Sequence, residues 1–408
     1  MRIRSITYFI HPKWPVDEQA IQQAAAFSLA ARQAYESAGF EVQTTRLASI
    51  PFSQLLPELS SKNVLSLAQQ MEELVRQSDF DYVSLGPALP DQPQAYELIP
   101  EVIAETENIF LSGLMTTPGG GVSLPATRAC AQVIHDTAPL SPDGFANLRF
   151  AALANVPAGA PFFPASYHQG EAPGFALAME AADLAVQAFS QTNSLEQARQ
   201  DLVHEIERLA GQLEQVAQGL SQQLKLAFKG LDFTLAPFPH PDLSFGTAIE
   251  RIGSPASGLH GSLAAAAILA DTLDQANFPR TGFNGLMMPV LEDAILAERA
   301  AQGTLSVKDL LMYSAVCGTG LDTIPLPGDA SPQQIQAVLL DLAALSQRLN
   351  KPLTARLMPI PGKVAGDPTG FDFAFFANSR VMALEASPLG SHLAGEETFV
   401  VKPRGERL

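Results

Sequence analysis

The chain has 408 residues, of which 47% are hydrophobic and 16% are charged, and its formal net charge is −17. This balance is typical of a protein with a sizeable buried core, and the acidic charge disfavours nucleic acid and anionic lipid as partners. The sequence has no Lys/Arg run. It has no apolar stretch of ~20 residues, so it predicts no membrane span. It also lacks a signal-peptide pattern, so it predicts a cytoplasmic location. Its two cysteines predict neither a disulfide framework nor, by themselves, a metal site.

The first third of the chain alternates strand-like and helical runs. Strands are predicted at 3–10, 40–47, 81–86 and 109–114, and helices at 17–38, at 64–77 and before Asn108. This alternation is typical of βαβ units, so it predicts a parallel sheet covered by helices.

A glycine-rich segment, "TTPGGGVSLPATRA" at 116–129, lies between a predicted strand and a predicted helix. Its backbone N–H groups could hold an anion at the start of that helix. The alternative is a turn that needs positive φ angles.

Two helix-capping patterns organise the second half. Ser194 with Gln197 predicts the start of one long helix that continues to Gly230, and we interpret residues 191–230 as a long helical insertion. Ser331 and Gln334, with proline between them, predict a helix to residue 349.

Three strand-like runs, at 231–238, 353–360 and 371–377, and a polar tail at 395–408 complete the pattern. We expect one α/β unit over residues 1–408, with a domain boundary near 190–230 as the alternative.

The common catalytic motifs are absent from the sequence. It contains no G-x-x-x-x-G-K-[ST], G-x-G-x-x-G, H-E-x-x-H or G-x-S-x-G, so P-loop hydrolysis, Rossmann dinucleotide use, zincin proteolysis and elbow-type esterase chemistry lack sequence support. The sequence therefore assigns no cofactor.

An acidic pair, Glu292 and Asp293, stands in "MMPVLEDAILAERAAQG". Pro289 predicts the first helical position and Gly303 the end, which puts both carboxylates in the first turn, where the helix dipole favours them. Adjacent residues point ~100° apart around a helix, so these two carboxylates do not share a face as a pair of metal ligands would. The pattern therefore favours stabilisation of the helix start over metal binding.

Polar loop residues supply further candidates. His168, His240 and His260 lie in loop-like surroundings, where each could be a general base or ligand, or could simply bond to backbone. The turn-rich segment 359–372, which contains Asp367, is either a ligand loop or a surface connection.

Cys317 follows a helix that Ser306 and Asp309 are predicted to cap, with Gly318 just past its end. This places the thiol in the last helical turn, where the dipole disfavours a thiolate. The pattern thus favours a buried small side chain over an ionised nucleophile.

Three stretches within residues 282–373 resemble one family. They are "GFNGLMMPVLEDAILAERAAQG", "DLLMYSAVCGTGLDTIPLPGD" and "KPLTARLMPIPGKVAGDPTGFDF", and they are similar to domain of unknown function family 711, also called uncharacterised protein family 0210. In the N-terminal half the resemblance is looser and is carried by "VQTTRL" and "PFFPASYH".

The resemblance implies a fold related to pyruvate formate-lyase and the anaerobic ribonucleotide reductases: a single ten-stranded α/β barrel with a loop inserted into it. In those enzymes the inserted loop carries a cysteine that becomes a thiyl radical, and here the loop would be residues 313–329. Glycyl-radical enzymes also carry an R-V-x-G motif, but "SRVMALE" has Ala383 in the place of the glycine, so a glycyl radical is not expected. Relatives are often encoded beside a small ACT-domain protein, which makes such a protein an expected partner.

The resulting hypothesis is an α/β barrel with a central pocket for a small polar metabolite. The competing hypothesis is a non-catalytic ligand-binding or regulatory protein, a homo-oligomer acting with an ACT-domain partner. The candidate catalytic residues are Cys317 and Asp322, and the candidate ligand-binding residues are Gly318, Thr319, Gly320, Glu292, Asp293, Arg356, Asp367 and His168.

Overall fold

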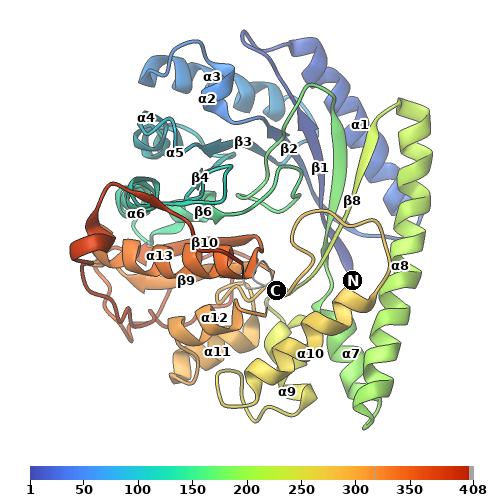
Figure 1. Cartoon of the computed structure of the whole chain (residues 1–408). Coiled ribbons are helices and arrows are strands. Elements are labelled where there is room, and N and C mark those ends of the chain that lie inside the picture. The colour runs from blue at the N-terminus through green and yellow to red at the C-terminus, as the bar shows by residue number, and fades with distance from the viewer. Residues whose placement is uncertain (317, 404–408) are drawn as a thin grey trace.

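Nine strands form the central sheet of the computed structural model, which describes residues 1–316 and 318–403 (Figure 1). The strands lie in the order β8-β7-β1-β2-β3-β4-β6-β10-β9. Their bounds are β1 (Arg2–Ile10), β2 (Val42–Ser49), β3 (Tyr82–Ala88), β4 (Ile109–Leu114), β6 (Phe150–Ala154), β7 (Gly174–Glu180), β8 (Ala227–Ala236), β9 (Gly320–Pro327) and β10 (Leu353–Ile360).

The sheet is mixed. Strands β1, β2, β3, β4 and β6 run parallel to one another, as the βαβ alternation predicts. The pairs β7–β8 and β9–β10 are also parallel, but β7 joins β1 and β10 joins β6 in antiparallel fashion. The parallel sheet predicted from the first third of the chain is therefore confirmed for β1 to β4, and the two antiparallel pairings involve β7 and β10, which lie beyond it.

Residues 280–289 lie between the two edge strands of this sheet. Isolated bridges join Leu231 to Arg280 and Leu235 to Leu286 on the β8 side, and Pro289 to Asp322 on the β9 side. The buried Asp232 side chain anchors the segment, because its carboxylate accepts hydrogen bonds from the backbone N–H groups of residues 283 and 284 at 2.7 and 2.9 Å.

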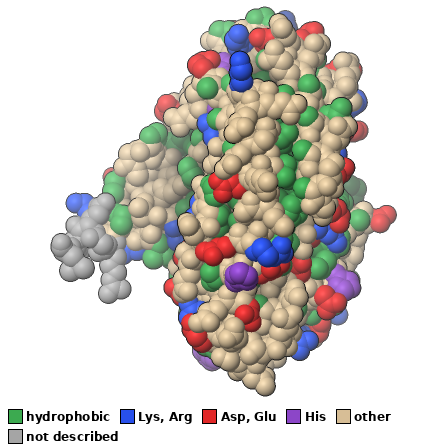
Figure 2. All heavy atoms as spheres, turned by 90° about the vertical axis from the view of Figure 1, so that its right-hand side faces the viewer, with side chains coloured by type: hydrophobic (Ala, Val, Ile, Leu, Met, Phe, Trp, Pro, Cys, Tyr) green, Lys and Arg blue, Asp and Glu red, His purple; other side chains and the backbone are tan. Residues whose placement is uncertain are grey.

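Helices cover the outside of the sheet in Figure 1. They are α1 (Glu18–Ser37), α2 (Phe52–Leu55), α3 (Ser61–Arg76), α4 (Gln94–Glu97), α5 (Ile99–Glu105), α6 (Leu124–Thr137), α7 (Ala182–Gln191), α8 (Leu195–Leu224), α9 (Phe245–Ile252), α10 (Ser262–Gln275), α11 (Ala294–Gln302), α12 (Val307–Tyr313) and α13 (Pro332–Leu349). None of these described helices is long and apolar enough to cross a membrane. On the face seen in Figure 2, acidic and basic side chains are interspersed.

The helix starts follow the capping patterns in the sequence. Ser194 caps α8 by accepting a hydrogen bond from the Gln197 N–H, and a full capping box opens α13. Helix α8 ends at Leu224, however, and Gly230 already belongs to β8, so residues 191–230 are not helical throughout.

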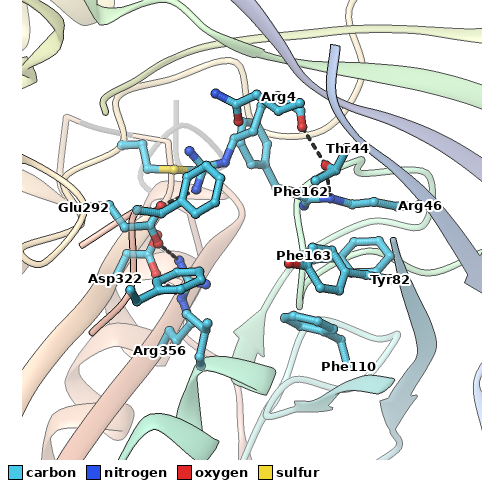
Figure 3. Close-up of a pocket in the computed structure, with 15 residues that line it drawn as sticks. Arg4, Thr44, Arg46, Tyr82, Phe110, Phe162, Phe163, Glu292, Asp322 and Arg356 are labelled. Atoms are coloured by element: carbon cyan, nitrogen blue, oxygen red, sulfur yellow. Dashed lines mark hydrogen bonds and ion pairs between the residues drawn. The ribbon is translucent and has the colours of Figure 1, made fainter. Parts of the chain in front are cut away.

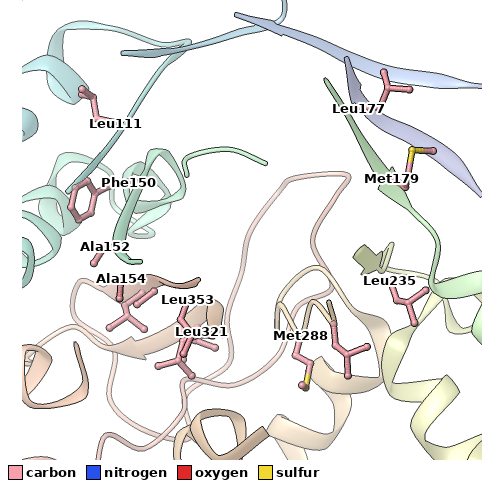
Figure 4. Packing of buried hydrophobic residues seen from close by; sticks show 14 of the residues in the cluster. Leu111, Phe150, Ala152, Ala154, Leu177, Met179, Leu235, Met288, Leu321 and Leu353 are labelled. Carbon is pink, nitrogen blue, oxygen red and sulfur yellow. The ribbon is translucent and has the colours of Figure 1, made fainter. Parts of the chain in front are cut away.

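Both faces of the sheet are buried, against different partners. Ala152 of β6 belongs to the large core shared with the helices (Figure 4), whereas its neighbour Ala151 packs in a smaller cluster with Phe162 and Met287. Successive strand residues point to opposite faces. The side of the sheet away from the helices is therefore enclosed by the chain itself.

Two predicted segments take other conformations. Residues 371–377 are not a strand, because the Asn378 side chain bonds both backbone groups of Phe371 and closes a loop whose rings pack on Phe145. Residues 320–327, expected to belong to an inserted loop, form the fully buried strand β9.

The polar tail also differs from expectation. Strand β11 (Thr398–Phe399) pairs in antiparallel fashion with β5 (Val122–Ser123), so part of the tail forms a second, two-stranded sheet.

Candidate functional site

A small pocket opens on the enclosed side of the sheet (Figure 3). Its volume is about 80 Å³, which leaves room for roughly three water molecules at ~30 Å³ each. It is lined by Arg4, Gln43, Thr44, Arg46, Tyr82, Phe110, Leu148, Phe162, Phe163, Met287, Glu292, Asp322, Arg356, Phe373 and Phe375. Residues from β1, β2, β3, β4, β9 and β10 thus meet at one place.

One wall of the pocket is a buried network of charges. Arg356 donates from Nε to Asp322 Oδ1 at 2.6 Å and from Nη2 to Glu292 Oε1 at 2.5 Å. Glu292 Oε2 accepts a further bond from Arg4 Nη2. Both Glu292 oxygens therefore have cationic partners, whereas Asp322 Oδ2 has no hydrogen-bond partner among the described residues.

The two carboxyl groups of this wall differ in acidity. Burial opposes ionisation of Glu292, but the guanidiniums of Arg4 and Arg356 outweigh it and lower its pKa below the ordinary value. Burial raises the pKa of Asp322, because Arg356 offsets it only in part and the charge of Glu292 adds to it. Glu292 is thus held ionised, while Asp322 takes up a proton more readily.

Arg46 on β2 faces this wall across the pocket (Figure 3). Its Nε donates to Thr44 Oγ1 at 2.9 Å, and the Thr44 hydroxyl donates in turn to the Arg4 carbonyl at 2.7 Å. The guanidinium lies over the rings of Phe163 and Tyr82, at 5.1 and 5.8 Å from their centroids. These contacts fix the group while leaving its two terminal nitrogens open.

No carboxylate within the described residues lies within ion-pair distance of Arg46, although the residue is only 8% exposed. Burial, followed by repulsion from Arg4, lowers the pKa of its guanidinium to about 9. An unpaired buried cation is costly, so this group is the natural position for an anion.

Aromatic rings form the rest of the wall beside Arg46. Tyr82 packs edge-on against Phe110 at 5.1 Å, and Phe110 lies 5.5 Å from Phe163. The pocket therefore combines one open guanidinium, one open carboxyl oxygen and an apolar surface between them.

The structure brings together three of the candidates named from the sequence, Glu292, Asp322 and Arg356, and separates the others. Asp293 is buried away from the pocket, where its carboxylate accepts from Ser244 Oγ and from backbone N–H groups at the starts of α9 and α11. It is the N-cap of α11, so the helix begins later than predicted, and Glu292 precedes it.

The residues around Cys317 have structural roles where they are described. Gly318 lies so close to Gly285 that a Cβ atom on either would collide with the other's backbone. Thr319 donates to the Leu286 carbonyl at 2.7 Å, and Gly320 begins β9 with a φ of +97°. Cys317 itself lies outside the described residues, and α12 ends at Tyr313, earlier than predicted.

The remaining candidates lie elsewhere. Asp367 accepts from the Val364 N–H in a turn, and His240 and His260 are exposed. His168 lies at a separate depression, is 3% exposed and has no partner for Nε2 among the described residues. Burial lowers its pKa to about 4, so this histidine is neutral at pH 7.

The glycine-rich segment 116–121 forms a closed turn, in which Gly120 has a φ of +81° and Gly121 accepts from the Thr117 N–H. Among the described residues, no group of three His, Cys, Asp or Glu side chains is arranged to hold a metal ion.

Arg4 and Arg46 are functional candidates that the sequence reasoning missed. Arg4 stands in β1 and Arg46 in β2, and most of the other residues of these two strands are buried. A charged residue within a strand buried on both faces is the signal that could have identified them.

Comparisons with known proteins give a family for the chain. A family model described as "Uncharacterised ACR (DUF711)" matches residues 1–377. A UPF0210 protein of Pyrobaculum arsenaticum is 30% identical over 356 residues, which cover 83% of this chain and 78% of the relative. A UPF0210 protein of Methanosarcina acetivorans is 28% identical over 389 residues, which cover 91% of this chain and 81% of the relative. A UPF0210 protein of Clostridium perfringens is 25% identical over 343 residues, which cover 81% of this chain and 76% of the relative.

Proposed function

The chain belongs to the DUF711 family, whose matched relatives have the UPF0210 designation and no assigned reaction, and we propose that it binds a small organic carboxylate at Arg46. The open guanidinium of Arg46 carries this proposal. A carboxylate accepts two parallel hydrogen bonds from the terminal nitrogens of arginine, and these nitrogens of Arg46 have no hydrogen-bond partner in the part of the chain that the structure describes.

The formal charges of the pocket support a ligand with one negative charge. Three arginines line it, at positions 4, 46 and 356, but only two carboxylates, at 292 and 322. Glu180 lies 3.8 Å from Arg4 outside this lining, and it has Arg2 at 3.9 Å as a second partner. A single carboxylate near Arg46 would balance the remaining charge.

The size and the aromatic wall of the pocket favour a compact organic molecule. A volume of about 80 Å³ excludes nucleotides and other large ligands unless the pocket opens further. The rings of Phe110 and Phe163 offer an apolar surface beside the guanidinium. An organic acid matches this surface better than an inorganic anion does.

We also propose that residues 280–289 act as a tenth strand and close the sheet into a barrel of the pyruvate formate-lyase-like type. The bridges from this segment to both edge strands support closure, since they leave no edge between β8 and β9 uncovered. The pocket would then lie inside the barrel, with the Arg46 side chain on its interior.

Ligand screening by thermal shift and calorimetry tests the binding proposal. The panel is acetate, propionate, lactate, succinate and inorganic phosphate, applied to the wild type, to Arg46→Met and to the control Arg128→Met, which removes an arginine that is 40% exposed and paired with Glu396. We expect a small carboxylate to stabilise the wild type and the control but not Arg46→Met. Equal stabilisation of all three proteins would refute the proposal.

A further inference from the structure

The wall opposite Arg46 offers one hydrogen-bond acceptor to a ligand. Glu292 uses both carboxylate oxygens on arginines, whereas Asp322 bonds through Oδ1 alone within residues 1–316 and 318–403. Asp322 is 6% exposed and lines the pocket, so a ligand that fills the pocket removes the remaining water from it. A buried carboxyl oxygen without a hydrogen bond is destabilised, so the ligand should supply a donor there.

Two chemical groups could supply that donor, and the surrounding charges distinguish between them. An ammonium group at Asp322 would lie beside the Arg356 guanidinium, which is 2.6 Å from the same carboxylate. The ammonium would add a fourth positive charge to a pocket that already has three arginines and two carboxylates. A hydroxyl group donates the same hydrogen bond without that repulsion.

The acidity of Asp322 favours the same choice. Because burial raises the pKa of Asp322, this carboxylate is protonated more readily than that of Glu292. A neutral hydroxyl can donate to the ionised form and accept from the protonated form, whereas an ammonium group requires the ionised form.

We infer that the ligand class is a small hydroxy-monocarboxylate, with its carboxylate on Arg46 and its hydroxyl on Asp322. This inference rests on the carboxylate-binding function proposed above and adds the specificity-determining role of Asp322. Figure 3 shows the two residues on opposite sides of the pocket, with aromatic side chains between them. The apolar part of the ligand would contact these rings.

Calorimetry with three matched probes tests the inference on the wild-type protein. Lactate carries the hydroxyl, propionate has hydrogen in its place, and alanine has an ammonium group there. We expect lactate to bind ~10-fold more tightly than propionate, as one hydrogen bond to a charged group is worth ~1.5 kcal/mol. We expect alanine to bind more weakly than lactate.

The variant Asp322→Ala removes both carboxyl oxygens, leaves no hydrogen-bonding group for the ligand hydroxyl, and should abolish the preference for lactate over propionate while both still bind. Equal affinities for lactate and propionate in the wild type, with both lost in Arg46→Met, would overturn the inference and leave the proposed function standing. Tighter binding of alanine than lactate would overturn the charge argument. If none of the three probes binds the wild type and the wider carboxylate panel is also inactive, the proposed function itself fails.

Discussion

Replacing Arg46 by methionine should make the unliganded protein more stable. Methionine keeps an unbranched apolar stem but removes the guanidinium, a buried cation that has no carboxylate partner among the described residues. The lowering of the pKa of Arg46 from its ordinary value to about 9 corresponds to ~5 kcal/mol of unfavourable free energy for the charged form, at ~1.4 kcal/mol per pH unit. Contacts with two aromatic faces return ~1–3 kcal/mol of this, so we expect a gain of ~2–4 kcal/mol in the free energy of unfolding.

The assay is urea unfolding at pH 7, followed by circular dichroism, with Arg356→Met as the matched comparison. Arg356 is just as buried but bonds two carboxylates, so its loss leaves Asp322 without a cationic partner among the described residues and Glu292 with Arg4 alone, and it should cost ~3–5 kcal/mol. Two arginines in one pocket are thus expected to change stability in opposite directions. If both variants are destabilised by similar amounts, Arg46 is already satisfied in the unliganded protein and the reasoning is wrong.

Two further predictions concern the buried charges. Glu292→Gln should lower the free energy of unfolding by ~3 kcal/mol or more, because it removes the negative charge that Arg4 and Arg356 share. Glu385→Gln, which removes an exposed ion pair with Lys308, should cost much less. Equal losses in urea unfolding would contradict the role given to the network. The pKa of His168 is lowered to about 4 in the folded state. The protein therefore has its full stability above pH ~6.5, where the imidazole is neutral, and loses stability as the pH falls toward 4. Allowing for screening of the imidazolium charge by solvent, the loss is ~2 kcal/mol. His168→Gln should therefore show a flatter stability profile than the wild type between pH 7 and pH 4, and identical profiles would refute this assignment.

Local signals in the sequence predict much of the fold. Hydroxyl caps such as Ser194, Ser306 and Ser331 start their helices as expected, because the capping side chain bonds backbone within three residues. The strands of the first third follow from their apolar runs. The antiparallel joints of β7 and β10 could not be predicted, since they depend on which distant strands meet.

The site was predicted only in part for a related reason. Glu292, Asp322 and Arg356 stand in segments that are conspicuous in the sequence, but nothing local indicates that they meet Arg4 and Arg46. The run at 371–377 illustrates the opposite error. Its alternating phenylalanines fit a strand, yet their rings pack around a loop that Asn378 closes.

The pocket is built from two portions of the chain that are well separated in sequence. Arg4 and Arg46 come from the parallel strands at the start of the chain, and Glu292, Asp322 and Arg356 from beyond residue 280. Neither portion alone contains both the cation that would hold a carboxylate and the acid that faces it. Ligand affinity would therefore report that the two portions have docked correctly, and a bound acid would act as a non-covalent clamp between the beginning and the end of the polypeptide.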